Sequence, residues 1–288
     1  MQCVILLESV NKKFGHKQAL KNISLTVTQG EIFGFLGPNG AGKTTAIRCI
    51  MDFIRPDTGT IQILNSSISN NPNIKQSIGY FAAENQLLEK WNAKQHIEFY
   101  RSVKQADKYA YKLLKELGLD DNMPVKHMST GNRQKLGFVL ALIGNPQLLI
   151  LDEPTRGLDP LLQNEVYEIL KDYVNNGGTV FMSSHNLSEV EHICTNVAVI
   201  RDGIIVADKS LADIRALKTY IVSVTFKEAG FKLPKANNLQ IISKGDHHLV
   251  IKLQGNVSPI IKELCRNELT DIEVTHASLE DVFMEFYK

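Results

Sequence analysis

Short apolar runs and amphipathic segments alternate along much of the chain. The apolar runs predict strands that are buried on both faces of a sheet, at 31–36, 148–151, 179–182 and 197–200. Apolar residues at helical spacing predict helices between them, at 44–53 and 163–174. Because strands that alternate with helices are typical of a parallel sheet, the sequence predicts an α/β fold.

Two regions around this pattern have a different character. Residues 1–83 alternate short β-rich runs with turn signals at 28–30 and 56–59, which predicts a mixed sheet. From 84 to 145, apolar residues at i, i+3 and i+4 in 96–100 and 111–117 predict a helical region.

The pattern changes again after Asp213. Residues 214–219 predict a short helical linker, and residues 220–288 predict a small α+β domain, which leaves 1–213 as the first domain. The expected elements of the small domain are strands at 220–226, 248–253 and 271–274 and helices at 258–267 and 278–287.

The composition limits the class of protein. The chain has 288 residues and a formal net charge of +1, which gives no electrostatic case for nucleic acid as a partner. Its four cysteines are scattered, without a C-x-x-C pair, and indicate a reducing, cytoplasmic compartment. Because no apolar run approaches the roughly 18 residues of a membrane helix, we expect any membrane passage to belong to another polypeptide.

One segment carries a phosphate-binding pattern. The run Gly37-Pro38-Asn39-Gly40-Ala41-Gly42-Lys43-Thr44-Thr45 matches G-x-x-x-x-G-K-[ST] at every fixed position, between a predicted strand and a predicted helix. Its glycines let successive N–H groups face a phosphate at the N-terminus of the helix. Lys43 then bridges the β- and γ-phosphates, Thr44 offers its hydroxyl to Mg²⁺, and Thr45 bonds to the α-phosphate. The sequence therefore predicts a nucleotide site with Mg²⁺.

A predicted buried strand ends in two carboxylates, Asp152 and Glu153. Open α/β sheets bind ligands at the carboxyl ends of their strands. Because side chains alternate along a strand, we expect Asp152 to face the Mg²⁺ held by Thr44 and Glu153 to face the attacking water. The alternative is a polar helix cap that follows a strand.

Further motifs complete an ordered set. They are the run Met128 to Leu136, the triplet Leu158-Asp159-Pro160 and the triplet Ser183-Ser184-His185. Together with the P-loop and the two carboxylates, they resemble the ATP-binding cassette (ABC) transporter ATPases over roughly residues 1 to 210. The resemblance implies a P-loop NTPase: a RecA-like core with an antiparallel β subdomain, an inserted helical subdomain at about 84–145, and the small C-terminal α+β domain.

The resemblance also implies roles for single residues. Ser129 and Gly131 belong to the family's signature motif, which contacts the γ-phosphate bound by the opposite subunit of a dimer. His185 matches the switch histidine that contacts the γ-phosphate, and Asp159 matches the aspartate of the loop that crosses the dimer interface. Phe14 occupies the place of an aromatic that stacks on adenine, with an ordinary apolar loop anchor as the alternative.

The chain departs from the family at one position near the metal. Ala83 lies where the family has a glutamine or glutamate that reaches Mg²⁺ and the attacking water. Because alanine offers no oxygen, the neighbouring Glu84 is a candidate ligand in its place, and a water molecule is the alternative.

The run 278–283 resembles the end of ATPases that energise drug, antibiotic and peptide exporters through a separate permease chain. We therefore expect an ABC ATPase subunit that binds and hydrolyses MgATP, with Lys43, Glu153 and His185 as catalytic residues. It is expected to form a homodimer, or a heterodimer with a related cassette, and to drive an export permease from the inner face of the cell membrane. The alternatives are a soluble ABC-type ATPase of a non-transport machine and a nucleotide sensor that barely hydrolyses ATP.

Overall fold

The computed structural model describes residues 2–68, 70–82, 87–104, 109–216, 219–230 and 239–276. The chain divides into two compact units, Met1–Asp208 and Lys209–Lys288. The division that the sequence predicts after Asp213 lies inside helix α7 (Leu211–Ala216).

A six-stranded sheet lies at the centre of the first unit, in the order β5-β6-β7-β3-β8-β9. Strands β5, β6, β7, β3 and β8 are paired in parallel. β3 and β6 are buried at every residue, which confirms the parallel sheet expected from the short apolar runs. The six strands are β3 (Ile32–Leu36), β5 (Ile78–Phe81), β6 (Leu148–Asp152), β7 (Thr179–Ser184), β8 (Asn196–Arg201) and β9 (Ile204–Ser210).

Three strands form a second, antiparallel sheet in the order β2-β1-β4. In sequence, β1 and β2 precede β3 and β4 follows it. This sheet consists of β1 (Cys3–Phe14), β2 (Lys17–Thr28) and β4 (Thr58–Ile63). Its apolar side chains join those of α1 (Lys43–Ile50) and of the six-stranded sheet in one buried core. Within that core the rings of Phe33 and Phe181 stack, with centroids 5.9 Å apart.

Helix α1 is shorter than the sequence predicts. The expected helix at 44–53 ends at Ile50, because Met51 caps it and Asp52 adopts a left-handed φ of 56°. The other helices of the larger sheet are α5 (Pro160–Asn175), which Asp159 caps, and the short α6 (Leu187–Ile193), while the 3₁₀ helix η1 (Pro72–Ser77) precedes β5.

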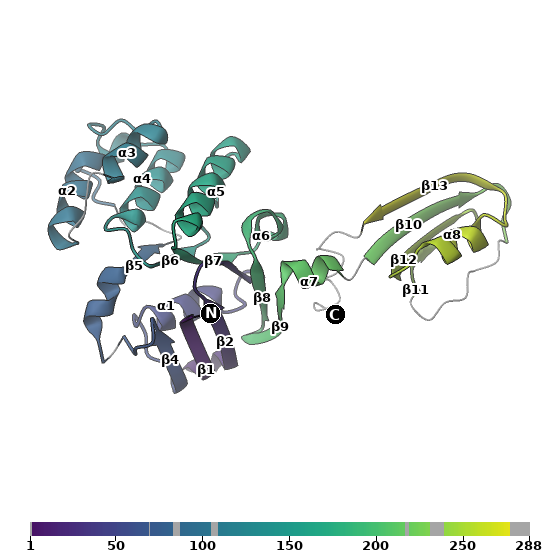
Figure 1. The fold of residues 1–288 in the computed structure, drawn as a ribbon, viewed down its shortest axis with the longest axis horizontal. Helices are drawn as coiled ribbons and strands as arrows, with labels where there is room; N and C mark the ends of the chain where they lie inside the picture. Colours follow the sequence, from purple (N-terminus) through teal and green to yellow (C-terminus); the bar gives the residue numbers. More distant parts are fainter. Residues whose placement is uncertain are drawn as a thin grey trace. The chain divides into compact units, whose positions relative to one another are not determined.

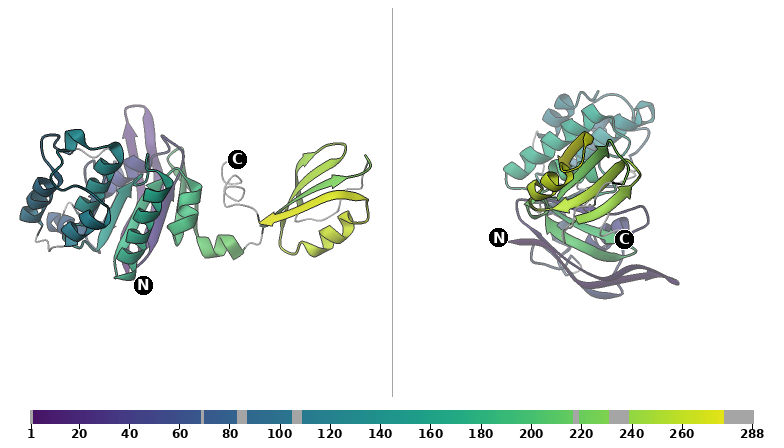
Figure 2. Two further views of the ribbon diagram at one scale, coloured as in Figure 1. Left: turned by 90° about the horizontal axis from the view of Figure 1, so that it is seen from above. Right: turned by 90° about the vertical axis from the view of Figure 1, so that its right-hand side faces the viewer.

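The predicted helical region contains α2 (Ala93–Val103), α3 (Tyr109–Glu116), the 3₁₀ helix η2 (Val125–His127) and α4 (Thr130–Leu142). α2 and α3 both contact α4, and α4 also contacts β5. Figure 1 shows these helices gathered on one side of β5 and β6, with the strands of the smaller sheet on the other side. In Figure 2 the blue and teal helices likewise form a group apart from the purple hairpin of β1 and β2.

The second unit is a four-stranded sheet in the order β11-β12-β10-β13, and all of its pairs are antiparallel. Its elements are α7, β10 (Thr219–Phe226), β11 (Leu239–Lys244), β12 (His248–Gln254), α8 (Ser258–Leu264) and β13 (Leu269–His276). α8 covers one face of the sheet (Figure 1), where apolar residues of β10, β12 and α8 form a separate core. Residues 217 and 218 of the predicted linker, the helix at 278–287 and the run at 278–283 lie outside the described residues.

Candidate active site

The glycine-rich loop between β3 and α1 is seated closely on its neighbours. Gly42 has a φ of 116°, and a Cβ atom there would lie 2.7 Å from the carbonyl oxygen of Ala19 in β2. A Cβ atom at Gly37 would overlap the carbonyl oxygen of Ile200 in β8. The N–H of Gly37 also donates to the carbonyl oxygen of Ser184 at 3.2 Å. The loop therefore requires glycine at both positions, for conformation at Gly42 and for close approach at each.

The ammonium of Lys43 is turned into this loop. Lys43 is the first residue of α1 and is only 5% exposed. Its Nζ donates to the carbonyl oxygens of Gly37 at 2.7 Å and Pro38 at 3.2 Å, and lies 3.2 Å from Oε1 of Glu153. The charge of a buried ammonium is thus balanced by one carboxylate and two carbonyl oxygens.

The two carboxylates after β6 are held in different ways. Asp152 ends the strand, is buried, and accepts a hydrogen bond from Oγ of Ser183 at 2.5 Å. Glu153 has left the strand, with a left-handed φ of 49°, and its N–H is shared between the carbonyl oxygen and the hydroxyl of Ser183. Both residues line the same hollow, so the separate roles expected for Asp152, toward Mg²⁺, and for Glu153, toward the attacking water, stay predictions. The turn at Glu153, a conformation that non-glycine residues rarely adopt, brings the two residues together.

His185 follows β7 and reaches Glu153 from the neighbouring strand. Its Nδ1 lies 2.8 Å from Oε2 of Glu153, and its side chain remains 47% exposed. Glu153 therefore contacts Lys43 through one carboxylate oxygen and His185 through the other. Lys43, Glu153 and His185, which were predicted to be catalytic, therefore form one continuous chain of contacts.

An open hollow of about 280 Å³ lies over these residues. Most of the predicted nucleotide and metal residues line it, namely Phe14, Asn39, Gly40, Gly42, Lys43, Thr44, Thr45, Asp152 and Glu153. Phe14 ends β1 with its ring half exposed, and the Lys12 ammonium lies 5.6 Å from the ring centroid. Lys17, Ala19 and Arg156 also line the hollow and were not predicted to do so.

Two predicted residues lie at the start of a different helix. Ser129 caps α4, its hydroxyl accepting from the N–H of Asn132 at 3.2 Å, and Gly131 follows in the first turn. Neither is among the described residues that line the 280 Å³ hollow. Gln134, one turn further along, donates to the carbonyl oxygen of Arg156 at 3.3 Å and so ties α4 to the loop after Glu153.

A second hollow, of about 160 Å³, shares Glu153 and Arg156 with the first and is also lined by His185 and Glu189. Glu189 is buried in α6, and burial raises the pKa of its carboxyl group above the usual value. Glu189 was not among the site residues predicted from the sequence. Its only local signal is its place four residues after His185, and one of its two partners, Thr155, lies 34 residues away in sequence.

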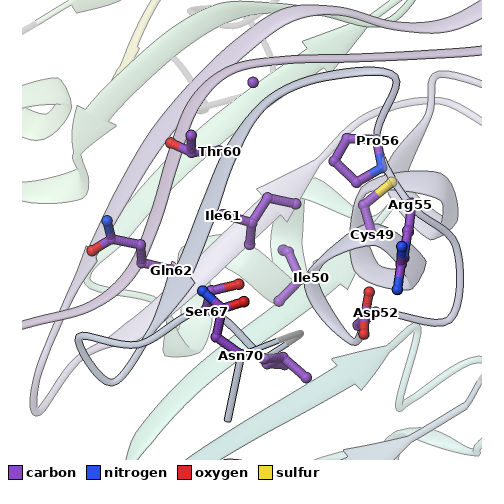
Figure 3. Close-up of a pocket in the computed structure, with 12 residues that line it drawn as sticks. Cys49, Ile50, Asp52, Arg55, Pro56, Thr60, Ile61, Gln62, Ser67 and Asn70 are labelled. Atoms are coloured by element: carbon purple, nitrogen blue, oxygen red, sulfur yellow. The ribbon is translucent and has the colours of Figure 1, made fainter. Parts of the chain in front are cut away.

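A larger hollow of about 630 Å³ lies between the end of α1, β4 and the segment after β4 (Figure 3). Cys49 and Ile50 of α1 and Thr60 and Ile61 of β4 are among the residues that line it. None of the residues predicted for the nucleotide site lines it. Its two charged lining residues, Asp52 and Arg55, are partly or fully exposed, so the hollow lacks the buried polar groups of a catalytic site.

The residues at the P-loop hollow fit a nucleotide phosphate with a divalent cation. The loop presents a cradle that side chains would fill, the hydroxyl of Thr44 is exposed at its rim, and Asp152 brings a buried carboxylate to the same hollow. In the described ranges no cluster of three or more histidine, cysteine or acidic residues could bind a metal by protein ligands alone. Mg²⁺ takes one or two protein ligands together with phosphate and water, and the two residues that could supply them, Thr44 and Asp152, both line the hollow. Ala83 and the candidate ligand Glu84 lie outside the described residues.

In the described part of the chain, no helix has the length and apolar character that crossing a membrane requires.

Comparison with known proteins gives consistent relatives. The family model described as ABC transporter matches residues 20–156. The uncharacterized ABC transporter ATP-binding protein YcbN of Bacillus subtilis is 34% identical over 99% of this chain and 97% of its own length. The lantibiotic transport ATP-binding protein SrtF of Streptococcus pyogenes is 32% identical over 72% of this chain and 90% of its own length. Among solved structures, a dimeric bacterial ABC transporter cassette superposes with a TM-score of 0.66 at 25% identity, over 72% of this chain and 98% of that one.

Proposed function

This chain belongs to the ABC transporter family as an ATP-binding subunit that hydrolyses ATP, and from this premise we propose that it dimerises around two MgATP molecules and powers a separate export permease. The observation that carries the proposal is the contact chain Lys43–Glu153–His185 beside the P-loop hollow. It joins an ammonium group that can bind phosphate, a carboxylate that can accept a proton from water, and a histidine, and it thereby supports the proposal.

The relatives support a separate permease and the direction of transport. A relative of nearly the same length, YcbN, is named for ATP binding alone, so the membrane part of its transporter is expected on another chain. SrtF is named for lantibiotic transport, which favours export of a substrate of that kind over import. In this arrangement the chain lies at the inner face of the cell membrane through its contact with the permease.

The position of the signature residues supports a dimer. Ser129 is exposed at the start of α4, and Ser129 and Gly131 do not line the described hollow of their own chain. They are therefore available to the phosphate bound by a second subunit. A dimeric cassette among the structural neighbours agrees with this arrangement. The partner is a second copy of this chain, or a related cassette in a heterodimer.

The residues that line the hollow have different proposed roles in ATP binding and hydrolysis. The loop N–H groups and Lys43 bind the β- and γ-phosphates, Phe14 stacks on the base, and Thr44 and Asp152 hold the metal ion. The metal ion supplies charge neutralisation at the transferred phosphoryl group. Glu153 takes the proton of the attacking water, and His185 orients Glu153 and adds a hydrogen bond to the γ-phosphate.

Substitutions at two residues test this division. Lys43→Ala is expected to abolish ATP binding and hydrolysis together, because it removes the cation that the phosphates need. Glu153→Gln is expected to retain ATP binding, lose turnover by at least about 100-fold, and accumulate an ATP-bound dimer that elutes earlier in gel filtration with MgATP. Glu165→Gln, which changes an exposed glutamate on α5, is the matched control. Near-normal turnover of Glu153→Gln would exclude Glu153 as the base.

A further inference from the structure

Glu189 is a buried acidic residue that the proposed chemistry does not use. It lies in the first turn of α6 and is only 4% exposed. The side chain of Asn186 caps this turn and accepts from the N–H of Glu189 at 3.4 Å. Burial of a carboxyl group is costly unless its oxygens are bonded, so the contacts of Glu189 indicate why it is there.

Each carboxyl oxygen of Glu189 accepts a hydrogen bond from a hydroxyl group. Oγ1 of Thr155 donates to Oε1 at 2.5 Å, and Oγ of Ser184 donates to Oε2 at 2.5 Å. All three residues are buried. The pKa of Tyr167, beside Thr155, is raised to about 12, first by burial and then by the charge of Glu189. The carboxyl group thus links Thr155 and Ser184, which lie in segments distant from each other in sequence.

The two segments carry the proposed base and its histidine. Thr155 lies two residues after Glu153, in a turn closed by hydrogen bonds from Arg156 to Glu153 and from Leu158 to Thr155. Ser184 directly precedes His185, and its carbonyl oxygen accepts from Gly37 of the P-loop. A change in the distance between Thr155 and Ser184 would therefore change the contact between Glu153 and His185.

We propose that Glu189 is a positioning residue for ATP hydrolysis, which keeps the loop of Glu153 and the loop of His185 at a fixed distance from each other. It touches neither the 280 Å³ hollow nor Lys43, and acts through the 2.8 Å contact between His185 and Glu153. A displacement of about 1 Å at a reacting group can cost two orders of magnitude in rate. The inference rests on the catalytic roles proposed above for Glu153 and His185.

Variants of Glu189 separate a positioning role from other roles. Glu189→Ala removes both hydrogen bonds and is expected to lower the turnover number about tenfold, with the ATP dissociation constant unchanged within about twofold. Glu189→Gln keeps the shape: its amide oxygen accepts from one hydroxyl and its NH₂ group donates to the other. It is therefore expected to retain turnover within about threefold of the unsubstituted protein. Glu165→Ala, which changes an exposed glutamate, is the control for both.

A double variant tests whether Glu189 acts through His185. If it does, Glu189→Ala in the His185→Ala background should cause less than about a twofold further loss, because the contact it supports is already gone. A full tenfold additional loss, or a loss of ATP affinity in the single variant, would overturn the proposal. So would turnover of Glu189→Gln as low as that of Glu189→Ala, since the carboxyl charge would then be what matters.

Two further variants keep the test decisive if Glu189→Ala does not fold by circular dichroism. Thr155→Val and Ser184→Ala each remove one hydroxyl and are expected to lower turnover about threefold, with unchanged ATP affinity. Normal turnover in both would overturn the proposal. Glu153→Gln, measured in parallel, distinguishes failure of the proposed function from failure of this inference. If Glu153→Gln retains turnover, the assignment of Glu153 as the base is wrong. If Glu153→Gln loses turnover and the variants of Glu189, Thr155 and Ser184 do not, only the role of Glu189 is wrong.

Discussion

At the scale of single residues, the contacts of Glu153 have a consequence for the catalytic cycle. Lys43 is neutralised by Glu153 and by two carbonyl oxygens of the loop. Phosphate oxygens at the hollow would compete for the same ammonium, because a buried cation needs a balancing anion. We therefore expect nucleotide binding to draw Lys43 away from Glu153. Glu153 would then keep its contact with His185 and become free to accept a proton from water.

A prediction at the same scale concerns Glu84, whose neighbour Ala83 cannot bind a metal. Glu84→Ala is expected to lower the turnover number about tenfold with little change in ATP affinity, because a group positioned in the transition state is lost. Steady-state ATP hydrolysis and nucleotide titration measure the two quantities. Ala83→Gln in the same chain should restore part of the activity. Glu89→Ala, which changes an exposed residue of the following segment, is the control. Unchanged turnover of Glu84→Ala would indicate that a water molecule, and not Glu84, occupies the ligand position next to the metal ion.

At the scale of elements, a buried tyrosine near the end of α5 forms a hydrogen bond to the segment before β6. The hydroxyl of Tyr173 donates to the carbonyl oxygen of Pro146, just before β6, at 2.6 Å. Its ring also fills the space beside Gly178, where a Cβ atom would overlap it. Because β6 ends at Asp152 and α5 begins at Pro160, this contact helps to set the geometry of the loop between them.

Tyr173→Phe tests that contact. It keeps the ring but leaves a buried carbonyl oxygen unpaired, which is expected to lower the free energy of unfolding by about 1–2 kcal/mol. Urea unfolding of the ATPase unit, followed by circular dichroism, measures the change. Tyr100→Phe, at a partly exposed ring of α2, should have less than about 0.5 kcal/mol of effect. Equal stability of the two variants would show that the hydroxyl of Tyr173 contributes nothing.

At the scale of the whole molecule, the two units have separate cores. The nucleotide residues all lie within Met1–Asp208, whereas the core of the second unit is formed by β10, β12 and α8. A small sheet with its own apolar core can fold by itself. We therefore expect the second unit to affect the transport cycle without contributing groups to ATP hydrolysis.

A chain that ends after Ala216 tests this separation. It is expected to remain folded and to bind ATP with an affinity within about threefold of the full chain, because no residue of the hollow is removed. Circular dichroism and isothermal titration with MgATP measure folding and affinity. Loss of ATP binding in a folded truncated chain would place part of the nucleotide site in the second unit.

Several features of this protein were determined by local sequence. The P-loop, the acidic end of β6 and the short apolar strands are patterns within a few residues, and the family resemblance rests on their order. The end of α1 and the strand β11 were harder to predict. A left-handed Asp52 ends α1 without a glycine or proline, and β11 is largely exposed, so it lacks the alternation that marks a half-buried strand.

The tertiary structure alone decided how the proposed catalytic groups meet. The parallel pairing of β6 with β7, and of β7 with β3, brings the P-loop, Glu153 and His185 to one edge of the sheet. The left-handed turn at Glu153 then directs its carboxylate to both Lys43 and His185, which alternation along a strand could not predict. Glu189 gains its two hydroxyl partners in the same way, one from the loop of Thr155, 34 residues away in sequence, and one from Ser184 at the end of β7, 5 residues away. Such contacts depend on strand order and backbone conformation, which residue spacing by itself does not specify.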